Sequence, residues 1–176
     1  YRSSDGLMRL VGPFGIAKLN TNETAVTTFE YTSTGSIEKA FEFGGQTLVY
    51  GSNLTNINGT PLSGAHSVAL LQGGTVTNLP QLVPNHSSEI RSIKYIGHNG
   101  SAWILLGNTT DFGGTPAIDG ILWDGTTITP IGGLPTGAGQ YAVDLENGIL
   151  GHSTGPFEWT GSSVTGSSMY PLKIDD

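Results

Sequence analysis

The sequence contains no cysteine, so disulfide bonds contribute nothing to its stability. Secreted domains from oxidising compartments often depend on such bonds, and a chain without them differs from the usual animal ectodomain. With 176 residues the chain is one ordinary domain, large enough to bury about two thirds of its unfolded surface without cross-links. If the protein is exported, this composition favours a prokaryotic cell surface.

Charge is scarce as well. Charged residues make up 12% of the chain and leave a net charge of -7, whereas about 25% is usual in soluble domains. Few basic residues disfavour a nucleic-acid partner. A surface with few carboxylates to protonate tolerates acid, which fits the cell surface of an acidophile. The alternative explanation is that β-rich extracellular proteins are often poor in charge.

Long hydrophobic runs and helical patterns are also missing. No window approaches the ~18 consecutive apolar residues of a membrane span, and Tyr1 does not begin a signal peptide. We therefore expect no membrane span in this chain and any anchor outside its 176 residues. No segment shows the periodicity of an amphipathic helix.

The chain is rich in acceptors for N-linked glycans. Six of its ten asparagines begin an Asn-X-Ser/Thr triplet without proline, where chance would supply about two. The excess predicts an extracellular glycoprotein, although a sequence rich in Ser and Thr would also raise the number. The predicted acceptors are Asn22, Asn53, Asn58, Asn85, Asn99 and Asn108.

Short strands separated by turns fill the rest of the sequence. The 27 glycines are scattered, and between them lie short runs of β-branched, aliphatic and aromatic residues. One kind of run ends in glycine after a Gly-Gly or Asn-Gly turn, at 47–51, 103–107 and 148–151. A second kind, at 29–32, 69–73, 121–125 and 157–161, precedes a β-branched residue that we expect in the next strand. Those residues are Ile37, Val76, Ile128 and Val164.

These repeats predict an all-β, propeller-like array of about four four-stranded blades in one domain, residues 1–176. The repeat averages about 44 residues, within the range of propeller blades, and its approximate bounds are 1–38, 39–84, 85–136 and 137–176. In the third repeat the strands are expected near Ile90–Tyr95, Ala102–Leu106, Gly120–Trp123 and Thr127–Ile131. A β-sandwich is the alternative, because it also has short, regularly spaced strands.

The third repeat resembles the kelch-like repeats of extracellular β-propellers. The likeness rests on Ile90–Tyr95, Asn99–Ser101, Trp103–Asn108, Gly120–Gly125 and Leu134-Pro135. It is closest to the glycosylated surface propellers of thermoacidophilic archaea and covers rather more than half of the chain, mainly the second and third repeats. The resemblance implies a propeller at the cell surface and carries over no catalytic residue.

One motif has the pattern of a catalytic serine. Gly151–Gly155 matches Gly-X-Ser-X-Gly, the nucleophile elbow of hydrolases, around Ser153. An elbow requires a helix next, whereas Pro156–Trp159 predicts a turn and a strand, and no histidine follows His152. The motif therefore predicts a structural turn.

Two tryptophans and a carboxylate are the candidate ligand-binding residues. Trp123 and Trp159 occupy equivalent repeat positions, and Asp124 follows the first of them. Packing between blades is the favoured role for both rings, and an exposed platform that stacks on a sugar is the functional alternative.

The sequence indicates no metal site or other cofactor. The histidines, at positions 66, 86, 98 and 152, lack the spacing of zinc ligands. Asp111, Asp119 and Asp124 lie in and after a long insertion, Asn108–Gly120, but they do not form the alternating run of a calcium loop. Solvated loop charge is the favoured interpretation.

Two classes of function remain open at the level of sequence. The first is a non-catalytic surface module for adhesion, for a coat or filament, or for binding a ligand, with a lectin as one form. The second is a secreted carbohydrate-active enzyme that uses two carboxylates in one cleft, drawn from Asp124, Asp144, Glu146 and Glu158. All six acceptors lie at or before Asn108, so the bare stretch 111–176 is the expected contact with another copy or a surface partner.

Overall fold

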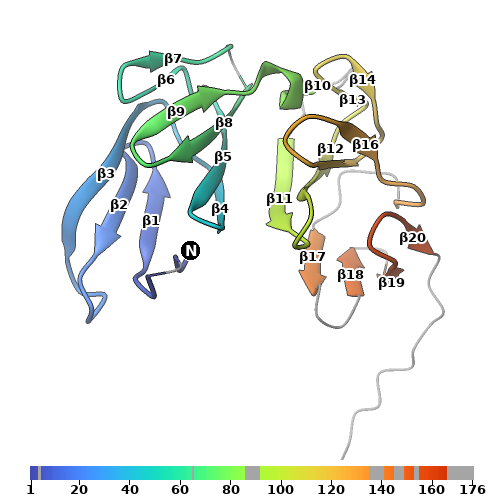
Figure 1. Ribbon diagram of the computed structural model, residues 1–176, viewed down its shortest axis with the longest axis horizontal. Helices are drawn as coiled ribbons and strands as arrows, with labels where there is room; N and C mark the ends of the chain where they lie inside the picture. The colour runs from blue at the N-terminus through green and yellow to red at the C-terminus, as the bar shows by residue number, and fades with distance from the viewer. Residues whose placement is uncertain are drawn as a thin grey trace, which may run out of the picture.

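The computed structural model describes residues 1–3, 5–64, 66–85, 92–134, 141–144, 149–152 and 155–165. In these residues the chain is all-β, as predicted: its strands form small antiparallel sheets, none closed into a barrel (Figure 1). The described residues include one short 3₁₀ helix, η1 (Pro80–Leu82). They contain no helix long and apolar enough to cross a membrane.

The second sheet has the strand order β4-β5-β8-β9. Its hairpin turns, Gly44-Gly45 and Gly73-Gly74, have positive φ at all four residues. Two consecutive residues at positive φ give the turn whose twist matches the flanking strands, and glycine adopts that φ without strain. The diglycine turns thus set the register of both hairpins. The strands are β4 (Lys39–Phe43), β5 (Gln46–Ser52), β8 (His66–Gln72) and β9 (Thr75–Asn78).

The third sheet repeats this arrangement in the order β11-β12-β15-β16. All four strands expected for the third repeat are present near their predicted positions. Every residue of β12 is buried, which explains why its sequence, WILLGN, lacks the polar alternation of a strand with one solvent face. The strands are β11 (Ser92–His98), β12 (Trp103–Asn108), β15 (Gly120–Trp123) and β16 (Ile128–Pro130).

The fourth sheet again pairs its strands in sequence order, β17-β18-β19-β20. β18 and β19 form an antiparallel hairpin, so the segment around His152 leads into a strand, as predicted, and not into the helix that a nucleophile elbow requires. Ser153 lies outside the described residues. The strands are β17 (Tyr141–Asp144), β18 (Ile149–His152), β19 (Gly155–Trp159) and β20 (Val164–Thr165).

The first sheet differs from the prediction. It has three strands from the start of the chain: β1 (Arg9–Gly12), β2 (Gly15–Leu19) and β3 (Val26–Thr34). The repeat pattern aligns 29–32 and Ile37 with 121–125 and Ile128, but Ile37 lies between β3 and β4 and in neither strand. Residues 29–32 lie within β3, which pairs with β2.

Gly35 is the reason for the difference. It has φ +90° and lies so close to the backbone of Asn53 that any side chain there would collide with it. The chain therefore leaves β3 at Gly35 and crosses to the second sheet. Ile37 is 1% exposed and belongs to the core between the first and second sheets. A β-branched residue stands at this repeat position because Ile37 is buried in that core, and not because it pairs in a strand.

The structure contains two similar inserted hairpins, whereas the sequence indicated one long insertion. β6 (Asn56–Ile57) and β7 (Thr60–Pro61) follow β5, whereas β13 (Asp111–Phe112) and β14 (Thr115–Pro116) follow β12. Each hairpin pairs back onto the chain that precedes its own sheet. β6 pairs with the end of β3, and β13 pairs with β10 (Pro84–Asn85).

The same backbone bonds hold both hairpins. Thr55 N donates to Thr34 O at 2.9 Å, and Thr110 N donates to Asn85 O at 2.8 Å. The sequence signal that could have revealed the pair is TNINGTP at 55–61 against TDFGGTP at 110–116.

Apolar layers separate the successive sheets. One core cluster joins the first and second sheets, a second joins the second and third, and a third joins the third and fourth. The first strands of consecutive sheets lie side by side, β4 with β11 and β11 with β17. The sheets therefore follow one another as a stack, in the order of the sequence.

Candidate functional site

Five of the six predicted acceptors have exposed side chains: Asn22, Asn53, Asn58, Asn85 and Asn99. They lie in turns or at strand ends, where a glycan would not enter a core. β6, β7 and β10 lie at one end of the molecule, whereas the β11–β12 turn lies at the opposite end (Figure 1). The exposed acceptors are therefore spread over both ends of the sheets.

Asn58 has a structural task in addition to its acceptor position. It occupies φ +49° in the β6–β7 turn, a conformation that asparagine tolerates better than most residues. Its Oδ1 accepts a hydrogen bond from Thr32 N at 2.8 Å, and its own N donates to Thr32 O at 2.9 Å. Nδ2, the atom to which a glycan would be attached, takes part in neither of these hydrogen bonds.

Asn99 uses its side chain to close the β11–β12 turn. Oδ1 accepts from Ser101 N at 3.0 Å and from Ala102 N at 2.8 Å. Nδ2 donates to Gly161 O at the long distance of 3.4 Å. A glycan on Nδ2 would disturb that one contact with the fourth sheet and leave the turn intact.

Asn108 lies at a strand end like several other acceptors, but it is buried. It is the last residue of β12 and only 8% exposed. The chain beyond it is buried too: Thr109 is 1% exposed, and its N donates to Asp119 Oδ1 at 3.3 Å. In the folded chain the β12–β13 connection covers this acceptor.

Trp123 and Trp159 pack in the core. Trp123 is 3% exposed and belongs to the cluster between the second and third sheets, while Trp159 is 8% exposed and belongs to the cluster between the third and fourth. Their burial fits a packing role, and neither ring forms an exposed platform for a sugar. The two residues belong to different core clusters.

A pocket of about 400 Å³ lies between the second and third sheets and includes part of the predicted site. Asp124 lines it, and its Oδ1 accepts from Thr126 N at 2.9 Å and from Thr127 N at 2.7 Å. These backbone hydrogen bonds hold the pKa of Asp124 below its usual value. The carboxylate thus closes the β15–β16 turn. The other lining residues are Gln46, Leu70, Thr77, Leu79, Gln81, His98, Trp103, Trp123 and Gly125.

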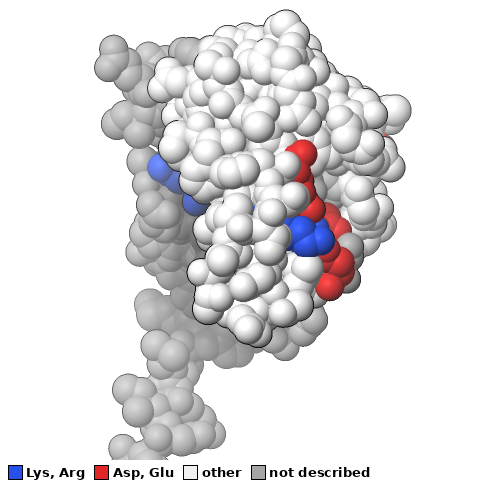
Figure 2. Space-filling model, turned by 90° about the vertical axis from the view of Figure 1, so that its left-hand side faces the viewer, with Lys and Arg blue, Asp and Glu red and all other residues white. Residues whose placement is uncertain are grey.

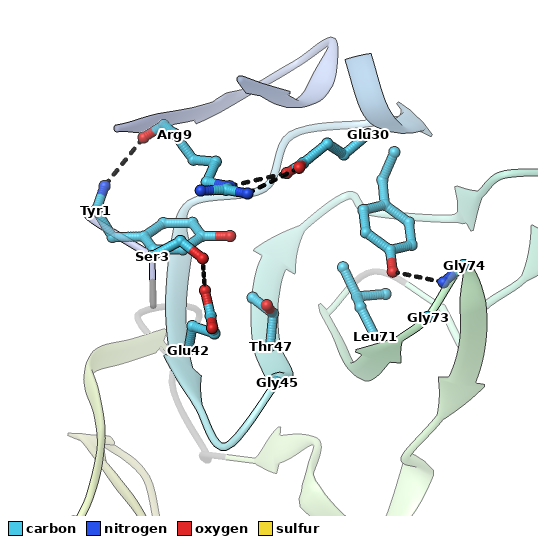
Figure 3. A pocket seen from close by; sticks show the side chains of 11 residues that line it. Tyr1, Ser3, Arg9, Glu30, Glu42, Gly45, Thr47, Leu71, Gly73 and Gly74 are labelled. Atoms are coloured by element: carbon cyan, nitrogen blue, oxygen red, sulfur yellow. Dashed lines mark hydrogen bonds and ion pairs between the residues drawn. The ribbon is translucent and has the colours of Figure 1, made fainter. Parts of the chain in front are cut away.

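A second pocket, of about 410 Å³, lies between the first and second sheets (Figure 3). Its polar groups already have partners within the chain. Glu30 accepts two hydrogen bonds from Arg9, and Ser3 Oγ donates to Glu42. Tyr31 Oη accepts from Gly74 N at 3.2 Å. The pocket is thus a seam that fastens the two sheets together.

Arg9 is the centre of the charged groups in this seam. It is 7% exposed, and its guanidinium group forms two hydrogen bonds with Asp5 and two with Glu30, at 2.8 and 2.9 Å for Glu30. These partners raise the pKa of Arg9, and the hydrogen bonds from Arg9 hold the pKa of Asp5 well below its usual range. Burial raises the pKa of the neighbouring Tyr1 hydroxyl to about 12.

Four ion pairs lie in the first sheet and its loops. They are Arg2–Glu23, Arg9–Asp5, Arg9–Glu30 and Lys18–Asp5. Figure 2 views the side of the molecule where β2 and β3 lie, and most of the acidic and basic side chains in view form one compact group. The surface around that group is uncharged.

Of the carboxylates proposed for an enzyme, the two whose side chains the structure describes do not share a pocket. Glu158 is an exposed residue of β19, and Asp124 lines the pocket beside the third sheet. Glu146 and the side chain of Asp144 lie outside the described residues. Glu30 and Glu42 line the other pocket, but they come from different sheets, and no local sequence pattern could have singled them out.

No group of three or more His, Asp and Glu side chains that could hold a metal occurs in the described part of the chain. Asp111 Oδ1 accepts from Gly114 N at 3.0 Å and so closes the β13–β14 turn. His66 is hydrogen-bonded to Tyr50 at 2.9 Å, and His98 stacks on Phe43. His86 and the side chain of His152 lie outside the described residues.

No family model matches the chain, and neither the curated proteins nor the solved structures compared with it give a match.

Proposed function

We propose that this chain is an N-glycosylated module of an extracellular or cell-surface protein that acts in adhesion or as part of a surface coat or filament. The observation that carries the proposal is the exposure of five acceptor asparagines at turns and strand ends. The sequence holds about three times as many acceptors as chance would supply. Most of them lie where a glycan can project into solvent without displacing a core side chain.

We propose further that the sheets are blades of a β-propeller-like array. Three of them are four-stranded antiparallel sheets with the strands in sequence order. The neighbouring positions of β4, β11 and β17 support a common axis along the first strands. A sandwich has two sheets around one apolar layer, whereas here three apolar layers separate four sheets.

A lectin and an enzyme are less well supported by the geometry. Trp103 and Trp123 are the aromatic residues best placed to stack on a sugar in the pocket between the second and third sheets. They are only 4% and 3% exposed. Asp124 is occupied by the backbone of its own turn. In the other pocket, Glu30 is paired with Arg9. We therefore favour a structural or adhesive module.

Mass spectrometry of glycopeptides from the native protein tests the proposal. We expect glycans at most of the exposed acceptors and little or none at Asn108, because burial protects it once the chain has folded. Native protein without a glycan at any exposed acceptor would contradict the proposal. The sites to compare with Asn108 are Asn22, Asn53, Asn58, Asn85 and Asn99.

A further inference from the structure

The first sheet carries an apolar face that nothing in the described chain covers. Among the described residues six large hydrophobic side chains are exposed, and four of them belong to this sheet or its turn. Their exposed fractions are 43% for Leu10, 41% for Phe14, 46% for Val26 and 55% for Phe29. Large exposed apolar patches usually mark a contact with another molecule.

The strand register places these side chains on one face. Leu10 on β1 is opposite Ala17 on β2, and Ala17 is opposite Phe29 on β3. Directly opposed residues point to the same side of a sheet, so the three form one row. Phe14 joins the row through an edge-to-face contact with Phe29, with ring centroids 5.8 Å apart.

A second row extends the same face. Leu19 is opposite Val26, and Leu19 lies two residues beyond Ala17 on β2, so it points to the same side. We call this surface the outer face of the first sheet; its exposed side chains are Leu10, Phe14, Val26 and Phe29, whereas Ala17 and Leu19 are 1% and 8% exposed.

The opposite face of the same sheet is already used. Val11, Ile16 and Tyr31 are opposed across the three strands and belong to the core shared with the second sheet. The first sheet thus carries apolar side chains on both faces, and its inner face also carries the paired Arg9 and Glu30. An antiparallel sheet with one face in solvent usually carries polar side chains on that face. Here the outer face carries leucine, valine and phenylalanine instead.

From this we infer that the outer face of the first sheet is the contact surface of a homodimer, in which the same face of a second copy covers it. The packing of the sheets inside the chain supports a second copy as the partner. Each pair of successive sheets is separated by an apolar layer, and two outer faces in contact would form one more layer of the same kind. A symmetric dimer needs only one self-complementary surface. The described chain offers one such concentration of exposed apolar side chains.

Charge supports the same arrangement. Each copy has a net charge of -7, so two copies repel at most relative orientations, and a stable contact must form where charge is low or internally paired. Beside the outer face, Lys18 is paired with Asp5 at 3.1 Å, and Arg2 with Glu23 at 2.5 Å. The contact itself is apolar, so added salt should strengthen the dimer by screening the net repulsion.

Sedimentation equilibrium of residues 1–176, made in a host without N-glycosylation, tests the inference. The glycosylated native protein is measured beside it, because Asn22 lies in the β2–β3 turn, and a dimer found only in the unglycosylated chain would overturn the inference. We expect a species of twice the 18.4 kDa chain mass at micromolar concentrations. A chain that stays monomeric at about 100 μM, well above the dissociation constant of a standard interface, would overturn the inference and point to a different cover.

Paired variants show whether this face forms the contact. The double variant Leu10→Ser, Phe29→Ser should raise the dimer dissociation constant by at least about tenfold, since buried apolar anchors dominate such interfaces. Ile118→Ser is the comparison variant, because Ile118 is 61% exposed and lies in the stretch 111–176, the contact that the sequence predicted instead. The melting temperature of the monomeric fraction reports whether the double variant folds. Equal weakening by the comparison variant would overturn the inference.

Cross-linking tests the dimer contact in a second way, by trapping the dimer and not by weakening it. The chain has no cysteine, so a single Phe29→Cys substitution creates one thiol per copy. Near a two-fold axis the two thiols should form a disulfide-linked dimer under mild oxidation. Ile118→Cys should not cross-link, and equal cross-linking of both variants would contradict a contact through the outer face.

Discussion

Gly107 on β12 lies against the carbonyl oxygen of Ser92 on β11, and a side chain at Gly107 would occupy the space of that oxygen. Gly51 has the same relation to Ser36 in the second sheet. The glycine that is the last residue but one of each of these strands is thus required by a close approach of two backbones rather than by an unusual φ.

Gly107→Ala should therefore destabilise the protein by roughly 2–4 kcal/mol, since the added Cβ would meet backbone atoms of Ser92 and Ile93, which cannot turn aside as a side chain can. Gly132→Ala is the matched control. A Cβ at Gly132 would have its nearest neighbour, Ser163 Cβ, at 3.9 Å, an ordinary contact. Urea unfolding followed by tryptophan fluorescence measures both variants, and similar midpoints for the two would contradict the close approach.

The two inserted hairpins make a prediction about Asn58 and Gly113, which occupy equivalent turn positions at φ +49° and +53°. Asn58→Gly should change the free energy of unfolding by no more than about 1 kcal/mol, because two effects oppose each other. Glycine adopts a positive φ more easily than asparagine does, whereas the hydrogen bond from Thr32 N to the side chain is lost. Gly113→Ala should cost more, about 2 kcal/mol or above, because its Cβ would lie 2.5 Å from the backbone of Gln81. Thermal unfolding of both variants checks the order, and the reverse order would refute the proposed equivalence.

The Arg9 seam should make stability depend on pH through Asp5. The folded pKa of Asp5 lies below its unfolded value near 4, so ionised Asp5 stabilises the fold above that value. This contribution is lost as pH falls toward the folded pKa. Asp5→Asn should be less stable than wild type at pH 7, with a gap that closes below about pH 4. Melting temperatures between pH 7 and pH 2 measure the gap, and a constant gap would argue against the ion pair.

Trp123 should behave as a core residue. Trp123→Ala removes a ring that is 3% exposed, and large-to-small changes of this kind cost about 3–5 kcal/mol. Thr129→Ala, at an exposed position on the neighbouring strand β16, is the control and should change stability by less than about 0.5 kcal/mol. Chemical denaturation distinguishes them. Near-wild-type stability of Trp123→Ala would restore a role for this ring outside the core.

The sequence by itself determined the parts of the structure that depend on neighbouring residues. The diglycine turns at 44–45 and 73–74 specify type I′ hairpins because few other residues adopt two positive φ values in succession. Runs such as Trp103–Leu106 specify buried strands because they are short and wholly apolar. Three four-stranded sheets and the packing role of the tryptophans were predictable for these reasons.

Only the tertiary structure decided which residues meet across the sheets. Arg9 and Glu30 are 21 residues apart, and their pairing depends on the register of β1, β2 and β3, which includes irregularities that no local pattern encodes. The burial of Asn108 likewise depends on how the inserted hairpin folds back, although its triplet resembles the exposed ones. Local sequence fixes turn geometry and apolarity, whereas burial and long-range pairing depend on how the sheets pack together.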